Sequence, residues 1–178
     1  MKGIVFTEFL ELVEDKFGYE MSDRIIGDSQ LPSGGVYTAV DTYHHSEMVQ
    51  LVTHLSKHSQ IPVDELLKVY GRHLFQRFSQ GYGVFFQNVT DSFAFLEQIE
   101  NYIHIEVRKL YPDAELPSIA TQRIDDNTLE LIYSSERRMA DFAHGLIEGC
   151  ATHFNDSFAI DRENLEPSGK QVKFTIRR

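Results

Sequence analysis

The spacing of the apolar residues changes near Pro112, and this change constrains the fold more than any other feature of the chain. Before it, apolar residues recur every three or four positions, which is typical of helices with one buried side. After it, two pairs of short alternating segments predict β-strands over 118–124, 128–135, 158–164 and 171–176. The chain is therefore expected to be α+β, with a helical N-terminal subdomain packed on a C-terminal subdomain of antiparallel sheet and helices.

Helix signals locate the remaining elements. Pro62 suits a first helical turn, Thr90 or Asp91 suits an N-cap, and Pro112 ends the helix before it. These signals and the apolar spacing predict helices over 2–16, 20–27, 44–58, 62–78, 91–110 and 139–154. A boundary between the two parts is expected near 60–65 or near 112. We take residues 1–178 as one domain, with an N-terminal lobe over 1–62 and a C-terminal lobe over 63–178.

Length and composition exclude several classes of protein. A chain of 178 residues with 42% hydrophobic content is expected to form one globular domain. No apolar run approaches the roughly 20 residues of a membrane helix, and the first residues become acidic too early for a signal peptide. We therefore expect a soluble, cytoplasmic protein without membrane insertion. The one cysteine, Cys150, excludes an internal disulfide and a cysteine-cluster metal site.

The charge of the chain is strongly negative. The net charge is −10, from 27 acidic and 17 basic residues, and no basic stripe is present, so nucleic acid is not an expected partner. An acidic surface favours a basic protein partner, although acidity is also common in soluble proteins and the plainer explanation is preferred. Thirteen Phe and eight Tyr without any Trp could fill the core, or could line a pocket for a large planar ligand.

Three hydrogen-bond donors alternate at the end of the predicted strand 128–135. If the strand continues, its period of two places Tyr133, Ser135 and Arg137 on one face. A phenol, a hydroxyl and a guanidinium can all donate to one anion, and Arg binds carboxylates and phosphates bidentately. This pattern alone indicates an anion site of unspecified kind.

His104 lies at the edge of an apolar stripe on the predicted helix 91–110. That stripe is formed by Leu96, Ile99, Ile103, Val107 and Leu110. A lone histidine in this position is usually a core-edge residue, but its neutral imidazole could also bind a haem iron. His54 and His58 have a zinc-like spacing but no third ligand, so a solvated helix face explains them better. Because a haem has one iron and two propionates, it could use both His104 and the donor triad.

Several motifs together resemble the H-NOX family, the haem nitric oxide/oxygen-binding domains related to the haem domain of soluble guanylate cyclase. The resemblance covers essentially the whole chain. It is carried by Met1-Lys2-Gly3, Gly71-Arg72, the stretch from His104 to Pro112, Leu116-Pro117, and the signature Tyr133-x-Ser135-x-Arg137. The combination of Tyr-x-Ser-x-Arg with an upstream His at this distance is highly specific. The resemblance implies one haem b per chain.

The resemblance also implies roles for individual residues. His104 matches the proximal iron ligand, and Tyr133, Ser135 and Arg137 match the propionate-binding triad. Pro117 matches a proline that presses on the porphyrin and holds it out of plane. Phe142 stands where oxygen-binding members have a Tyr, and the other positions that match the distal wall are also apolar, namely Val5, Phe9, Leu74 and Leu146.

These matches imply a non-enzymatic sensor that binds NO and CO at ferrous haem and excludes O2. NO is expected to weaken or break the His104–iron bond, which relaxes the distorted haem and shifts the two lobes. The signal would pass to a separate partner, a histidine kinase or alternatively a diguanylate cyclase. Two alternatives stay open: a haem enzyme, such as a peroxidase or NO-detoxifying enzyme, and a protein of the same fold that binds another hydrophobic ligand with His104 merely structural.

Overall fold

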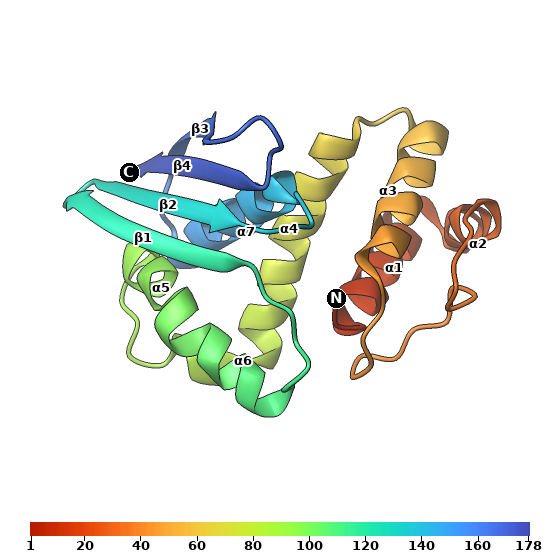
Figure 1. The fold of residues 1–178 in the computed structure, drawn as a ribbon, viewed down its shortest axis with the longest axis horizontal. Coiled ribbons are helices and arrows are strands. Elements are labelled where there is room, and N and C mark those ends of the chain that lie inside the picture. The colour runs from red at the N-terminus through yellow and green to blue at the C-terminus, as the bar shows by residue number, and fades with distance from the viewer.

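A computed structural model describes residues 1–178 and has the predicted α+β architecture, with three N-terminal helices on one side and a sheet with further helices on the other (Figure 1). The α-helices are α1 (Ile4–Phe17), α2 (Tyr19–Asp28), α3 (His45–Ser59), α4 (Val63–Gly81), α5 (Ser92–Gln98), α6 (His104–Leu110) and α7 (Ala140–Phe154). A 3-10 helix, η1 (Gly83–Phe86), follows α4. None of these helices has both the length and the apolar character that a membrane crossing requires.

The sheet contains four antiparallel strands in the order β1-β2-β4-β3, namely β1 (Ser118–Asp125), β2 (Thr128–Ser134), β3 (Ala159–Asn164) and β4 (Gln171–Arg177). The Asp125 carboxylate accepts from the Asn127 amide at 2.8 Å, which stabilises the predicted turn between β1 and β2. Alternate residues of the two central strands face the core, where they are buried against α7 and α5: Leu129, Leu131, Tyr133, Val172, Phe174 and Ile176. The predicted period of two is therefore confirmed in these strands.

The buried side chains form two separate cores with α4 between them. One core contains the inner face of the sheet, α5 and α7, and the other contains α1, α2 and α3. Neighbouring residues of α4 belong to different cores, because Phe75 joins the sheet core and Leu74 joins the N-terminal core. The division of the chain at residues 62 and 63 stays a prediction.

Helices α4 and α7 cross at backbone contact distance. A Cβ built on Gly71 would lie 2.4 Å from the Phe142 carbonyl oxygen, and one on Gly145 would lie 2.1 Å from the Lys68 carbonyl oxygen. Both positions therefore favour glycine, because a side chain there would meet backbone and the two helices would have to move apart. This crossing holds α7, and with it Phe142, at a defined position beside α4.

The prediction of one regular α-helix over 91–110 is wrong for residues 99–103. Asp91 caps α5 as expected, since its carboxylate accepts from the amides of Phe93 and Ala94 at 3.0 and 3.1 Å. The helix then widens into a π-turn, η2 (Ile99–Ile103), before α6 begins at His104. A π-turn holds an extra residue, so every side chain after it points in a different direction from that in a regular helix. Apolar spacing does not reveal such a local insertion.

Candidate functional site

A cavity of about 320 Å³ lies between the two cores. Of its 31 lining residues 25 are hydrophobic, which suits an apolar organic ligand with few polar groups. Nine of the ten predicted site residues line it: Val5, Leu74, His104, Pro117, Tyr133, Ser135, Arg137, Phe142 and Leu146. Residues from α1, α4, α6, α7 and β2 thus meet at one place, although they are distant in sequence.

His104 is the first residue of α6 and is 9% exposed. Its Nδ1 lies 3.1 Å from Glu100 Oε2, and because a carboxylate only accepts, the ring must donate from Nδ1. Nε2 is then unprotonated and makes no hydrogen bond within the protein. Burial lowers the pKa of His104, against the opposing effect of the nearby Glu100 carboxylate, so the ring is neutral near pH 7. A neutral imidazole with a free Nε2 is the form that binds a metal.

The π-turn places Glu100 at a junction of three groups. Besides His104, its Oε2 accepts from the Ile119 amide in β1 at 2.9 Å, and its Oε1 accepts from Arg108 at 3.4 Å. Burial opposes ionisation, but the Ile119 amide and His104 hold the pKa of Glu100 below its ordinary value. The only sequence signal for Glu100 is its spacing of four residues from His104, which places both side chains on one face of a regular helix.

The donor triad is arranged by the end of a strand together with the turn that follows it. β2 ends at Ser134, so strand alternation does not extend to Arg137. The Ser135 amide donates to the Lys170 carbonyl at 2.9 Å, and the Arg137 amide donates to the Ser135 hydroxyl at 3.2 Å. The first bond continues the pairing of β2 with β4, whereas the second, together with the Arg138 amide that donates to the Ser135 carbonyl at 3.3 Å, turns the chain at residues 135–138. All three residues of the triad line the cavity, but strand periodicity does not explain the position of Arg137.

Tyr133 and Arg137 are positioned to donate. The Met139 amide donates to the Tyr133 hydroxyl at 3.2 Å, which leaves the phenolic hydrogen free for an acceptor. Burial raises the pKa of Tyr133, so the phenol is protonated. Arg137 donates to Glu115 at 3.1 Å, and the Glu115 side chain is 83% exposed. An ion pair with so exposed a carboxylate is weak, so the carboxylate of a ligand can replace Glu115.

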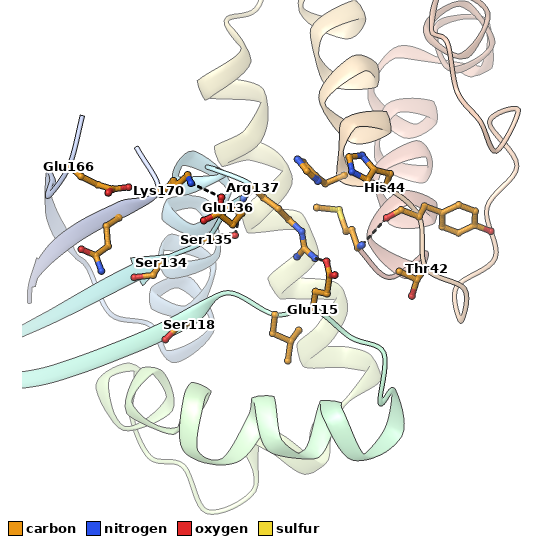
Figure 2. A pocket seen from close by; sticks show the side chains of 15 residues that line it. Thr42, His44, Glu115, Ser118, Ser134, Ser135, Glu136, Arg137, Glu166 and Lys170 are labelled. Atoms are coloured by element: carbon orange, nitrogen blue, oxygen red, sulfur yellow. Dashed lines mark hydrogen bonds and ion pairs between the residues drawn. The ribbon is translucent and has the colours of Figure 1, made fainter. Parts of the chain in front are cut away.

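Outside the cavity, a polar groove of about 950 Å³ runs between the end of the sheet and the N-terminal helices (Figure 2). In Figure 2 Arg137 extends from the sheet side toward Glu115, and His44 faces the same space from the N-terminal helices. Glu115, Leu116, Ser135 and Arg137 line both the groove and the cavity. The cavity is therefore apolar inside and opens to solvent at the end where Ser135 and Arg137 lie.

The wall around Phe142 offers no hydroxyl donor. The Phe142 ring stacks on Tyr70 with centroids 5.1 Å apart and planes at 26°. Tyr70 is fully buried and its hydroxyl donates to the Val5 carbonyl, so this hydroxyl has no hydrogen left to donate to a ligand in the cavity. Phe9 does not line the cavity, in contrast to the prediction. It packs edge-on against Tyr70 with centroids 5.2 Å apart and so supports the wall from behind.

His54 and His58 face α2. His58 Nε2 lies 2.7 Å from Asp28 Oδ2, and His54 Nδ1 lies 3.9 Å from the same oxygen. No group of three possible metal ligands is present there or elsewhere in the chain. Cys150 is a buried core residue, as predicted, with its sulfur 3.7 Å from the Ser92 carbonyl oxygen.

These residues fit a haem. The free Nε2 of His104 suits an iron, the apolar walls suit a porphyrin, and the converging donors of Tyr133, Ser135 and Arg137 suit its propionates. The fold and the cavity are thus those expected of a haem-binding protein.

Comparison with known proteins identifies the family. The family model described as "Haem-NO-binding" matches residues 2–162, and the chain belongs to this family. The Fe(II) unliganded H-NOX protein of K. algicida is 47% identical, with a TM-score of 0.94 over 99% of this chain and 96% of that one.

Two further H-NOX structures carry gas ligands. The protein of Shewanella woodyi in the Fe(II)CO state, bound to IWP-051, is 44% identical, with a TM-score of 0.85 over 100% of this chain and 94% of that one. The S. oneidensis protein in the Fe(II)NO state is 28% identical, with a TM-score of 0.91 over 99% and 98%. No curated protein sequence matches the chain. The family and these neighbours make the chain a haem-based gas-sensing domain.

Proposed function

We propose that this protein is an NO sensor that holds one ferrous haem b per chain, binds NO and CO, and excludes O2. The observation that carries the proposal is the presence in one cavity of a free His104 Nε2 and of Phe142, which has no hydrogen-bond donor and stacks on a Tyr70 whose hydroxyl is bound to Val5. The H-NOX structures of S. oneidensis with NO and of S. woodyi with CO support the choice of gases.

Selection against O2 follows from the chemistry of the wall. Bound O2 carries partial negative charge, and a buried donor stabilises it by roughly 1–3 kcal/mol. Phe142 cannot donate, and the hydroxyl of Tyr70 behind it is bound to Val5. NO and CO depend less on such a donor, so their binding is expected to be retained.

In the proposed mechanism His104 would hold the iron through Nε2, and Pro117, which immediately precedes β1, would press on the porphyrin from the cavity wall. When bound, the haem would supply a ferrous iron able to take NO or CO. Binding of NO would weaken or break the bond of His104 Nε2 to the iron, so that α6 would no longer be held to the haem. The pressure on Pro117 would then be relieved, and the N-terminal helices would shift relative to the sheet. Such a shift is a two-state change that ligand binding biases.

We further propose that the shift is read by a separate protein, a histidine kinase or alternatively a diguanylate cyclase. The net charge of −10 suits docking to a basic surface. A haem enzyme is the weaker candidate, because peroxide cleavage uses a polar acid–base pair beside the iron and the Phe142 wall supplies none.

Absorption spectra of the purified protein test the proposal. The ferrous protein is expected to show a Soret band that shifts with NO and with CO and that stays unchanged in air. His104→Gly should lose or shift this band, whereas His54→Gly, which also places glycine in a helix, should leave it unchanged. A stable oxy spectrum in air would contradict the O2 exclusion, and steady turnover of peroxide or NO would favour the enzyme.

A further inference from the structure

Glu100 connects the histidine that faces the cavity to the sheet through one carboxylate oxygen. Its Oε2 accepts from His104 Nδ1 at 3.1 Å and from the Ile119 amide at 2.9 Å. The second of these donors is a backbone group of β1, so the carboxylate cannot swing away without breaking a bond to a strand. Glu100 is therefore fixed in place, unlike an ordinary surface carboxylate at 30% side-chain exposure.

A carboxylate in this position acts on the opposite nitrogen of the ring. By accepting from Nδ1 it fixes the tautomer that leaves Nε2 free, and it holds the ring plane in one orientation. It also increases electron density on the imidazole, which makes Nε2 a stronger ligand. The strength of the bond to a metal at Nε2 thus depends on the charge of a residue that does not itself touch the metal.

The Glu100 carboxylate also links His104 to the strand that follows Pro117. Ile119 lies two residues after Pro117 in the chain, and Pro117 lines the cavity. A movement of His104 toward or away from the cavity is therefore transmitted through Glu100 to the first residues of β1. No other side chain makes a hydrogen bond to the His104 ring.

We propose that Glu100 is the positioning residue that sets the strength of the His104–iron bond, and hence how readily NO releases His104. The inference rests on the proposed function, because it assumes that His104 binds the iron. It assigns the tuning of the sensor to the π-turn, whose extra residue brings Glu100 to both its partners.

Arg108 should affect the strength of the His104–iron bond in the opposite direction to Glu100. Its guanidinium donates to Glu100 Oε1 at 3.4 Å and is 45% exposed, so it partly neutralises the carboxylate from the solvent side. Removing this cation should increase the charge that Glu100 exerts on His104. Loss of Arg108 and loss of the Glu100 charge should therefore change the iron bond in opposite directions.

The test compares the haem-loaded protein with Glu100→Gln and Arg108→Ala. Gln keeps the size of Glu and can still accept from the Ile119 amide, but it carries no charge. The iron–histidine stretching frequency of the unliganded ferrous protein, read by resonance Raman spectroscopy, should fall in Glu100→Gln and rise in Arg108→Ala. With NO, the ratio of His104-released to His104-bound protein should increase on the order of 10–100-fold in Glu100→Gln, the usual effect of losing such a partner.

Glu106→Gln is the matched control, because Glu106 lies on the same helix and pairs with Lys109 rather than with His104. It should leave both readings unchanged. An unaltered stretching frequency in Glu100→Gln would overturn the inference alone. If Glu100→Gln does not retain haem, Arg108→Ala decides, and a frequency that stays the same or falls overturns the inference. A parent protein without a Soret band, or without an iron–histidine band, would overturn the proposed function as well.

Discussion

At the scale of single residues, Phe142 matters because its ring lacks the hydroxyl group that a tyrosine would bring to the cavity wall. Its ring lies in the cavity wall and is held against Tyr70, whose hydroxyl is bound to the Val5 carbonyl. The wall is thus closed and apolar although a tyrosine lies directly behind it. At this position of the wall, a hydroxyl is present only if residue 142 itself carries one.

Phe142→Tyr is therefore expected to give the ferrous protein affinity for O2. One buried donor contributes roughly 1–3 kcal/mol to a partly charged ligand, which corresponds to about one to two powers of ten in affinity. Oxygen titration of the ferrous protein, followed at the Soret band, measures the change. Phe142→Leu is the control, since it alters the shape without adding a donor, and equal O2 affinity in both variants would refute the donor argument.

At the scale of elements, the crossing of α4 and α7 positions Phe142. The Phe142 carbonyl oxygen is itself the atom that a side chain at position 71 would meet. Any residue larger than glycine there must push α7 away from α4. The distal wall of the cavity is thus set by two missing side chains, at Gly71 and Gly145, as much as by the side chains that line it.

Gly71→Ala is expected to destabilise the fold by about 1–3 kcal/mol, the usual cost of overpacking, because the clashing atom is backbone. Urea unfolding measures the loss. Gly27→Ala in α2 serves as the control, since nothing lies within 4 Å of the added Cβ. It should stabilise the helix by roughly 0.5–1 kcal/mol. A Gly71→Ala protein as stable as the parent would show that the two helices separate without cost.

At the scale of the whole molecule, the cavity lies where two cores meet, so its shape depends on how the cores are held together. Polar contacts at one edge contribute, since Lys2 and Thr42 both bind Asp113 at 3.1 and 2.5 Å. These residues join the N-terminal helices to the segment that leads from α6 to Pro117. A ligand that moves this segment therefore acts on both sides of the molecule.

Pro117→Ala should relax the porphyrin in the unliganded protein, because it removes the rigid ring that we propose presses on the haem. Resonance Raman bands of out-of-plane porphyrin modes, or a crystal structure of the ferrous variant, measure the distortion. Pro112→Ala is the control, since Pro112 follows the end of α6 and does not line the cavity. If the distortion is the same in Pro117→Ala as in the parent, Pro117 does not cause it.

Much of the fold follows from local patterns that the chain carries in its sequence. The helix caps, the turn at Asp125-Asp126-Asn127 and the change of period near Pro112 depend on neighbouring residues, so they predict the elements and the α+β class well. The spacing of His104 from Tyr133, Ser135 and Arg137 indicates one family, and the match of residues 2–162 to the haem-NO-binding family confirms that family. Cys150 in the core is another such case.

Tertiary structure alone decided how those residues are used. The π-turn that turns Glu100 toward both His104 and Ile119 changes no residue type, so periodicity over 91–110 cannot register it. The turn after β2, and not strand alternation, brings Arg137 to the cavity mouth. Phe9 lies behind the wall because Tyr70 occupies the space in front of it. Each of these outcomes depends on contacts between residues far apart in the chain, whereas sequence patterns record only the preferences of neighbours.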